Sequence, residues 1–219
     1  SSIDFALDTS NTNLFSGENE ETVFKSRTGV IGMTHKYFFN STMFSKISLV
    51  ASSTTSAEEV DSTGFNTKVR SPQLHYHRVL NNYTMHFKLN KKINVRNTWN
   101  AGIIGKVDGI NFKDSLNIDN NFTETLNYKG NSLLTQVYFS WRHHFTEKLT
   151  GNFGIRAQYF DFSKSTSVEP RIGMKYDLTK KSKISLGFGL HSQIQPISTY
   201  YVKDRENLFN STPNKDLDF

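Results

Sequence analysis

The chain lacks cysteine altogether, so it can form neither a disulfide nor a thiolate-bound metal site. It also lacks any run of about 18 apolar residues, and its mean hydropathy is only −0.53, which argues against a transmembrane helix. A basic segment is missing as well, because the net charge of +6 comes from Lys and Arg scattered along the chain. Nucleic acid is therefore not an expected partner.

Aromatic residues, by contrast, are abundant and reach 13%, with 18 Phe and 9 Tyr. Membrane β-barrels concentrate aromatic side chains in girdles at the two membrane interfaces, which explains such an excess. A low mean hydropathy is compatible with a barrel, since half of each strand can be polar. The alternative is a soluble β-sandwich with an aromatic core.

Residues 168–193 show the clearest pattern in the chain. Apolar or aromatic residues alternate with polar, charged or glycine residues from Val168 to Leu178, and again from Ile184 to Gln193. A period of two indicates extended chain, and the short polar connection at 179–183 predicts an antiparallel hairpin. Each arm keeps its alternation for about 10 residues, the length that a tilted strand needs to cross a bilayer, whereas a globular strand has about 5–6.

The same rhythm recurs along the chain and predicts eight or nine strands. Tight polar turns are expected near Ser41, Lys91, Glu147 and Lys181. Long polar loops are expected at 52–71, at 107–130 and after Pro196, with a short exception at 163–167. Short turns on one side and long loops on the other are typical of a membrane barrel. The predicted fold is therefore all-β: an antiparallel up-and-down transmembrane β-barrel, present as a segment of about eight or nine strands.

Two sets of residues are predicted to face different surroundings in this barrel. The turn boundaries carry an aromatic residue or Leu that fits an interfacial girdle: Phe39, Leu89, Phe145 and Leu178. A barrel turns its charged and small side chains towards a watery lumen. The candidate lumen-facing residues are Glu169, Arg171, Lys175, His191, Gln193, Arg156 and Arg142.

Sites for metal or catalysis are not expected. His75 and His77 share a strand face and would form half a metal site, but no further His or carboxylate follows at a fixed short offset. Gly-x-Ser-x-Gly, Walker and His-Glu-x-x-His motifs do not occur, so no catalytic residue, cofactor or enzyme activity is predicted.

The segment EPRIGMKYDLTKKSKISLGFGLHSQIQP at 169–196, followed by NKDLDF at 214–219, resembles the barrel of TonB-dependent outer-membrane receptors. The close resemblance covers residues 168–219. It implies a location in the outer membrane of a Gram-negative bacterium and a barrel of roughly 22 strands around an N-terminal plug. It also implies import of a large or scarce nutrient, powered by an energy-coupling inner-membrane complex. Outer-membrane lipid and a surface lipoprotein are further implied partners.

We expect residues 1–219 to be part of a single outer-membrane β-barrel domain, with the plug domain and the closing strands absent. No signal peptide is visible at Ser1, and Pro213 cannot donate to a strand ladder near the end of the sequence. Strands before Ser1 and after Phe219 would then close the barrel. Two alternatives stay open: a complete small outer-membrane barrel with a structural or adhesion role, and a soluble carbohydrate-binding β-domain.

Overall fold

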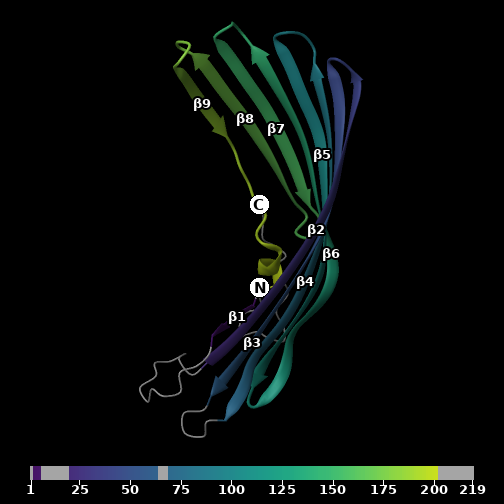
Figure 1. Cartoon of the computed structure of the whole chain (residues 1–219), viewed down its shortest axis with the longest axis vertical. Helices are drawn as coiled ribbons and strands as arrows, with labels where there is room; N and C mark the ends of the chain where they lie inside the picture. Colours follow the sequence, from purple (N-terminus) through teal and green to yellow (C-terminus); the bar gives the residue numbers. More distant parts are fainter. Residues whose placement is uncertain (1, 6–19, 64–68, 202–219) are drawn as a thin grey trace. The chain divides into compact units, whose positions relative to one another are not determined.

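The computed structural model describes residues 2–5, 20–63 and 69–201. In this part of the chain each strand pairs with its neighbours in sequence, giving one sheet in the order β1 to β9 (Figure 1). The strands are β1 (Ser2–Phe5), β2 (Glu20–Asn40), β3 (Met43–Thr63), β4 (Arg70–Lys92), β5 (Asn97–Ile118), β6 (Asn121–His144), β7 (Leu149–Phe160), β8 (Ser165–Asp177) and β9 (Lys183–Gly189), followed by the 3-10 helix η1 (Ile197–Tyr201). The predicted all-β, up-and-down fold is confirmed.

The described residues belong to two compact units. One unit contains residues 2–5, 20–31, 51–63, 69–82 and 108–131, and the other contains residues 32–50, 83–107 and 132–201. Strands β2 to β6 contribute residues to both units, whereas β7, β8 and β9 belong to the second unit alone. Among the described residues, no helix is long and apolar enough to span a membrane.

The hairpin of β8 and β9 forms as its alternation predicts, with Met174 opposite Leu186 and Gly173 opposite Gly187. Its two faces reverse the usual pattern of a soluble sheet. The apolar residues are exposed, 45% for Ile172 and 77% for Leu186, while Glu169 on the polar face is 1% exposed. Exposed apolar side chains on one face and a buried carboxylate on the other suit a sheet that has lipid as its outer solvent.

The two long loops predicted within the described chain are largely strand, and those predictions are wrong. Within 52–71, β3 continues to Thr63 and β4 begins at Arg70, while 64–68 lie outside the described residues. Within 107–130, β5 and β6 are joined by a two-residue turn at Asp119 and Asn120, with φ of 52° and 62°. Asp and Asn tolerate this left-handed conformation better than other non-glycine residues, so they close a tight hairpin.

Three strand ends also differ from the expected positions. The turn expected at 90–92 lies at 93–96, because the Asn94 side chain accepts hydrogen bonds from the backbone N–H of Arg96 (3.0 Å) and Asn97 (2.9 Å). The loop expected at 163–167 ends at Lys164, whose φ is 54°, and β8 begins at Ser165. Strand β9, expected to continue to Gln193, ends at Gly189.

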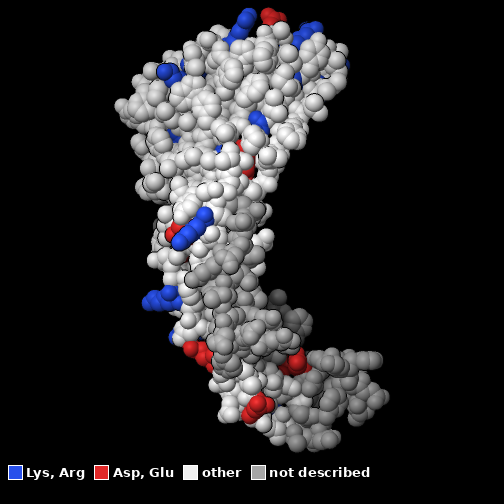
Figure 2. All heavy atoms as spheres, turned by 180° about the vertical axis from the view of Figure 1, so that it is seen from behind, with Lys and Arg blue, Asp and Glu red and all other residues white. Residues whose placement is uncertain are grey.

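An aromatic cluster lies near the turn between β6 and β7. The rings of Trp141 and Phe153 are 5.4 Å apart, and those of His143 and Phe145 are 4.5 Å apart. The indole N–H of Trp141 donates to Asn97 Oδ1 at 3.0 Å. Figure 2 shows Lys and Arg side chains gathered at the end of the second unit, where the β6–β7 and β8–β9 turns lie. Amphipathic rings beside a charged rim are typical of a membrane interface.

Candidate functional site

The strand register places a group of polar side chains on one face of β6, β7 and β8. Arg156 lies opposite Glu169, and Gln136 lies opposite Gln158. Arg171 follows Glu169 by two residues and therefore shares its face. The result is a polar patch built from three neighbouring strands of the same unit.

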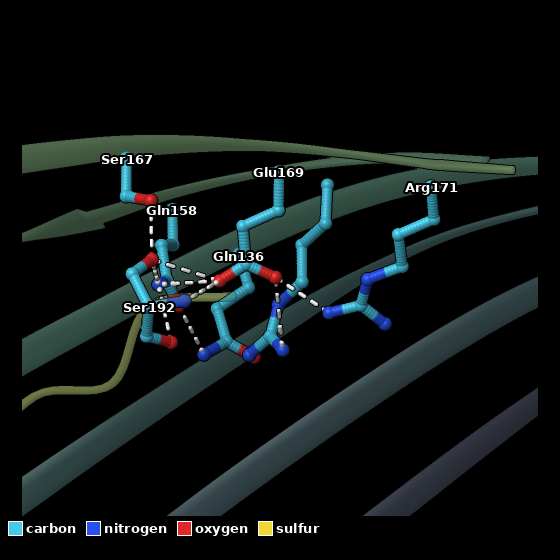
Figure 3. Close-up of polar contacts among 7 residues, drawn as sticks. Gln136, Gln158, Ser167, Glu169, Arg171 and Ser192 are labelled. Carbon is cyan, nitrogen blue, oxygen red and sulfur yellow. Dashed lines mark hydrogen bonds and ion pairs between the residues drawn. The ribbon is translucent and has the colours of Figure 1, made fainter. Parts of the chain in front are cut away.

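Glu169 is the centre of this patch and is almost fully buried. Its Oε2 accepts a hydrogen bond from Arg171 Nη2 at 2.5 Å and lies 3.9 Å from Arg156 Nη1. Its Oε1 accepts from Gln158 Nε2 at 3.1 Å (Figure 3). A buried carboxylate is tolerated only when it is paired and hydrogen-bonded in this way.

The segment after β9 completes the cluster. Ser192 donates to Glu169 Oε1 from its backbone N–H at 3.0 Å and from its hydroxyl at 2.8 Å. The same hydroxyl accepts from Gln158 Nε2 at 2.9 Å and is hydrogen-bonded to the Ser167 hydroxyl. The chain leaves the ladder after Leu190, whose N–H donates to Pro170 O at 3.1 Å. These contacts explain why β9 ends before Gln193: the backbone of Ser192 bonds to a side chain instead of a strand.

A second contact holds this segment farther along. The Tyr200 ring in η1 is buried and packs against Phe160 and Phe162, with centroid distances of 5.4 Å and 5.5 Å. The segment is therefore attached to the sheet by polar contacts at Ser192 and by aromatic contacts at Tyr200. We refer to residues 190–200 as the return segment.

A hollow of about 450 Å³ lies between the return segment and the strands. Its lining residues are Leu134, Gln136, Arg156, Gln158, Glu169, Arg171, His191, Ser192, Gln193 and Ile194. Five of the seven predicted site residues line it together: Glu169, Arg171, Arg156, His191 and Gln193. The other two lie elsewhere, since Lys175 Nζ is 3.5 Å from Asp177 Oδ1 and Arg142 Nε donates to Asn152 Oδ1 at 3.1 Å.

Four residues of the cluster were not among the predicted candidates: Gln136, Gln158, Ser167 and Ser192. Gln136 and Gln158 carry a signal, because they alternate with apolar residues on the polar face of their strands. Ser192 carries none, since continued strand alternation would place it on the apolar face with Leu190. Its position depends on the chain leaving the strand.

The arrangement holds two guanidinium groups around one carboxylate, so its formal charge is positive. The side chain of Arg171 is 42% exposed and that of Arg156 is 30% exposed, so both keep N–H groups available to the hollow. A guanidinium presents several donors in a fixed plane and binds carboxylates and phosphates well. The cluster can thus position an anionic or hydrogen-bonding ligand.

A second polar cluster lies in the other unit, on β3, β4 and β5. Arg78 donates to Asp114 through Nε at 3.0 Å and Nη2 at 2.5 Å, and its guanidinium lies 4.8 Å from the Tyr76 ring centroid. Burial, together with a hydrogen bond to Glu58, raises the pKa of the Tyr76 hydroxyl to about 12. Tyr76 lies beyond the roughly 10 residues that β4 needs to cross a bilayer from its turn.

The histidines considered for metal binding lie in separate surroundings. The His75 ring contacts the Phe122 ring at 4.8 Å, and His77 lines a different hollow with Lys25 and Arg27. Over the described ranges, no group of three or more His, Cys, Asp or Glu side chains is arranged to hold a metal ion.

Long antiparallel strands with exposed apolar residues on one face and paired charges on the other define the wall of an outer-membrane β-barrel. The chain matches the family described as "TonB dependent receptor-like, beta-barrel" over residues 2–218. It therefore belongs to this family of outer-membrane receptors, which work with the TonB energy-coupling system, and the predicted resemblance is confirmed. Comparison with curated proteins gave no match, and comparison with solved structures gave none either.

Proposed function

We propose that this chain forms part of the wall of a receptor that imports a large or scarce nutrient across the outer membrane of a Gram-negative bacterium. Energy would come from the inner-membrane complex, through a plug region on the N-terminal side of the barrel. The family match over residues 2–218 supports this function over a small adhesion barrel or a soluble carbohydrate-binding domain.

The observation that carries the proposal is the hollow between the return segment and the polar face. We infer that this face is the lumen face, with Glu169, Arg171, Lys175, His191, Gln193, Arg156 and Arg142 along it. The buried Glu169 supports this orientation, because a carboxylate paired with two arginines is costly to place against lipid. A nutrient passing the return segment would meet the free N–H groups of the two arginines.

Cysteine labelling of the full-length receptor tests the orientation. Arg171→Cys is expected to react with a hydrophilic, membrane-impermeant maleimide in outer-membrane vesicles. Ile172→Cys, the adjacent residue on the apolar face, is expected to stay unlabelled until detergent is added. Labelling of Ile172→Cys in intact vesicles, with Arg171→Cys protected, would reverse the orientation.

Bacterial growth under nutrient limitation tests whether the receptor imports a nutrient. A strain without the receptor is expected to grow more slowly than its complemented parent when one nutrient, such as the iron or carbon source, is supplied only as a scarce large complex. Inactivating the energy-coupling complex is expected to abolish the difference between the two strains. Equal growth of both strains under every limitation would contradict an import function.

A further inference from the structure

A second hollow lies in the unit that contains the long hairpins. Its volume is about 810 Å³, and it is lined by four consecutive residues of β2 (Lys25, Ser26, Arg27 and Thr28), by Thr55 and Ala57 of β3, and by His77 of β4. Lys25, Arg27 and His77 are exposed. Basic and hydroxyl-bearing residues line this hollow, and no carboxylate whose side chain the structure describes lines it.

Hydrogen-bonded side-chain pairs across the strands show which residues share a face. Thr28 and Thr54 are hydrogen-bonded across β2 and β3 at 3.2 Å, and Tyr76 is hydrogen-bonded to Glu58 across β4 and β3. These even-numbered residues therefore lie on the face that also carries Arg78. Because side chains alternate, the odd-numbered residues of the three strands lie on the other face.

The same pairs define the neighbours around the hollow. If Thr28 lies opposite Thr54, Arg27 lies opposite Thr55 and Lys25 opposite Ala57. If Glu58 lies opposite Tyr76, Ala57 also lies opposite His77. The small Ala57 therefore lies between the longer side chains of Lys25 and His77 in one cross-strand row. Its short side chain leaves space at the bottom of the hollow.

An apolar residue continues this face along β2 within the same unit. Ile31 lies four residues beyond Arg27, so its side chain points to the same side, and it is 75% exposed. Basic side chains beside an exposed apolar side chain suit the border between hydrocarbon and lipid headgroups.

The nearby carboxylates whose side chains the structure describes do not neutralise the hollow. Glu21 and Asp61 are both paired with Arg70. Glu59 shares the odd-numbered face, but it is two residues beyond Ala57 and does not line the hollow. The described charged side chains that an incoming ligand meets there, Lys25 and Arg27, are positive.

We infer that this hollow binds the phosphate of an anionic lipid headgroup in the outer leaflet. The inference rests on the outer-membrane function proposed above and on Ile31, whose exposed apolar side chain assigns this face of β2 to lipid. Lys25 and Arg27 supply charge-assisted hydrogen bonds, because a long basic side chain keeps its aliphatic stem in the hydrocarbon while its charged end reaches the headgroup. Thr55 supplies a neutral hydroxyl donor, and the neighbouring Ile31 contacts the acyl chain.

Lipid retention by the purified full-length receptor tests this site. Receptor in detergent is mixed with phosphatidylglycerol, phosphatidylcholine or inorganic phosphate, and bound molecules are counted by native mass spectrometry. Phosphatidylglycerol is expected to be retained in preference to phosphatidylcholine. The double variant Lys25→Gln/Arg27→Gln is expected to weaken this binding roughly 25-fold, at about fivefold for each basic side chain at an anionic surface.

Two further variants separate the site from general charge and folding effects. Lys180→Gln/Lys181→Gln removes the same charge from the β8–β9 turn and is expected to leave lipid retention unchanged. Ala57→Phe fills the hollow while keeping both basic residues and is expected to reduce retention. A migration shift on heating in gels shows that each variant is folded.

Several results would overturn the inference. They are equal retention of the two lipids, an equal loss in the turn variant, and undiminished binding by Ala57→Phe. Displacement of the lipid by an equal concentration of inorganic phosphate would show a site for a free anion instead. If lipid retention fails while Arg171→Cys is labelled by the hydrophilic maleimide as expected, only the lipid site is rejected. If the labelling of Arg171→Cys and Ile172→Cys is reversed, the proposed orientation itself is rejected.

Discussion

Replacing Glu169 tests whether the return segment is held to the sheet by one carboxylate. In Glu169→Ala the Ser192 N–H and the Arg171 guanidinium lose their acceptor. A buried N–H left without a partner costs about 1–3 kcal/mol, and a hydrogen bond between charged groups contributes about 1.5–3 kcal/mol. Arg171 is partly exposed and regains water, so the lower end applies to it. We expect a total loss of about 3–4 kcal/mol.

Glu169→Gln separates the charge from the hydrogen bonds. The amide oxygen still accepts from Ser192 and Gln158, while the charge facing Arg171 is removed. We expect a loss of about 2 kcal/mol, mainly from the charge-assisted bond to Arg171. Gln158 and the Ser192 hydroxyl are also bonded to each other in the native protein, so we expect them to keep a partner in both variants.

The assay is guanidinium chloride unfolding of the full-length receptor in phospholipid vesicles, followed by circular dichroism. Limited proteolysis adds a local measurement, since release of the return segment should expose the chain near Ser192 to cleavage in Glu169→Ala and less so in Glu169→Gln. A loss below about 1 kcal/mol in Glu169→Ala, or equal losses in both variants, would refute the reasoning from unsatisfied buried groups.

Three further predictions concern depth, sidedness and pH. Leu186→Arg should destabilise the receptor by about 2–4 kcal/mol if it faces the middle of the bilayer; Gly187→Arg should cost less, and equal costs in an unfolding titration would contradict the assignment of faces. An epitope inserted at Asp119 should bind antibody on intact cells and one at Lys181 should not; labelling at Lys181 would invert the topology. Because the Tyr76 pKa is raised above its unfolded value of about 10, folding stability should fall as pH rises from 10 towards 12, and Tyr76→Phe should remove that part of the slope in unfolding titrations.

The sequence was sufficient to predict which residues share a strand face. A period of two places Glu169 and Arg171 together on β8, and hairpin pairing brings Arg156 opposite Glu169. These relations are local or follow from a short turn, so they need no knowledge of distant contacts. Lys175 is predicted on the same face of β8 as Glu169, but it does not line the hollow. Alternation identifies the face of a residue and not its position along the strand.

His191 and Gln193 reach the hollow by a different route from the predicted one. Alternation assigned them to a continuing strand, whereas they lie in the return segment after β9 has ended. The interaction that redirects the chain joins Ser192 to Glu169, 23 residues apart. A contact at that separation leaves no signal in a periodic pattern.

The two long-loop predictions were wrong because the composition of these segments is typical of loops. Residues rich in Ser, Thr, Asn and charge usually indicate loops, because their side chains compete with the backbone for hydrogen bonds. In this chain the same side chains bond across strands, as Thr28 does with Thr54 and Arg78 with Asp114. Beyond the bilayer a strand no longer needs an apolar face, so its sequence loses the alternation that identifies it.

The inverted faces also determine where the stability of such a sheet resides. An apolar side chain such as Leu186, which is 77% exposed, is stabilised by lipid and does not hold one segment of the chain against another. Backbone ladders and contacts on the polar face must do that instead. Glu169 and Ser192 belong to that polar face and also line the hollow. On the proposed import path, a ligand at this level would meet the same residues that hold the return segment.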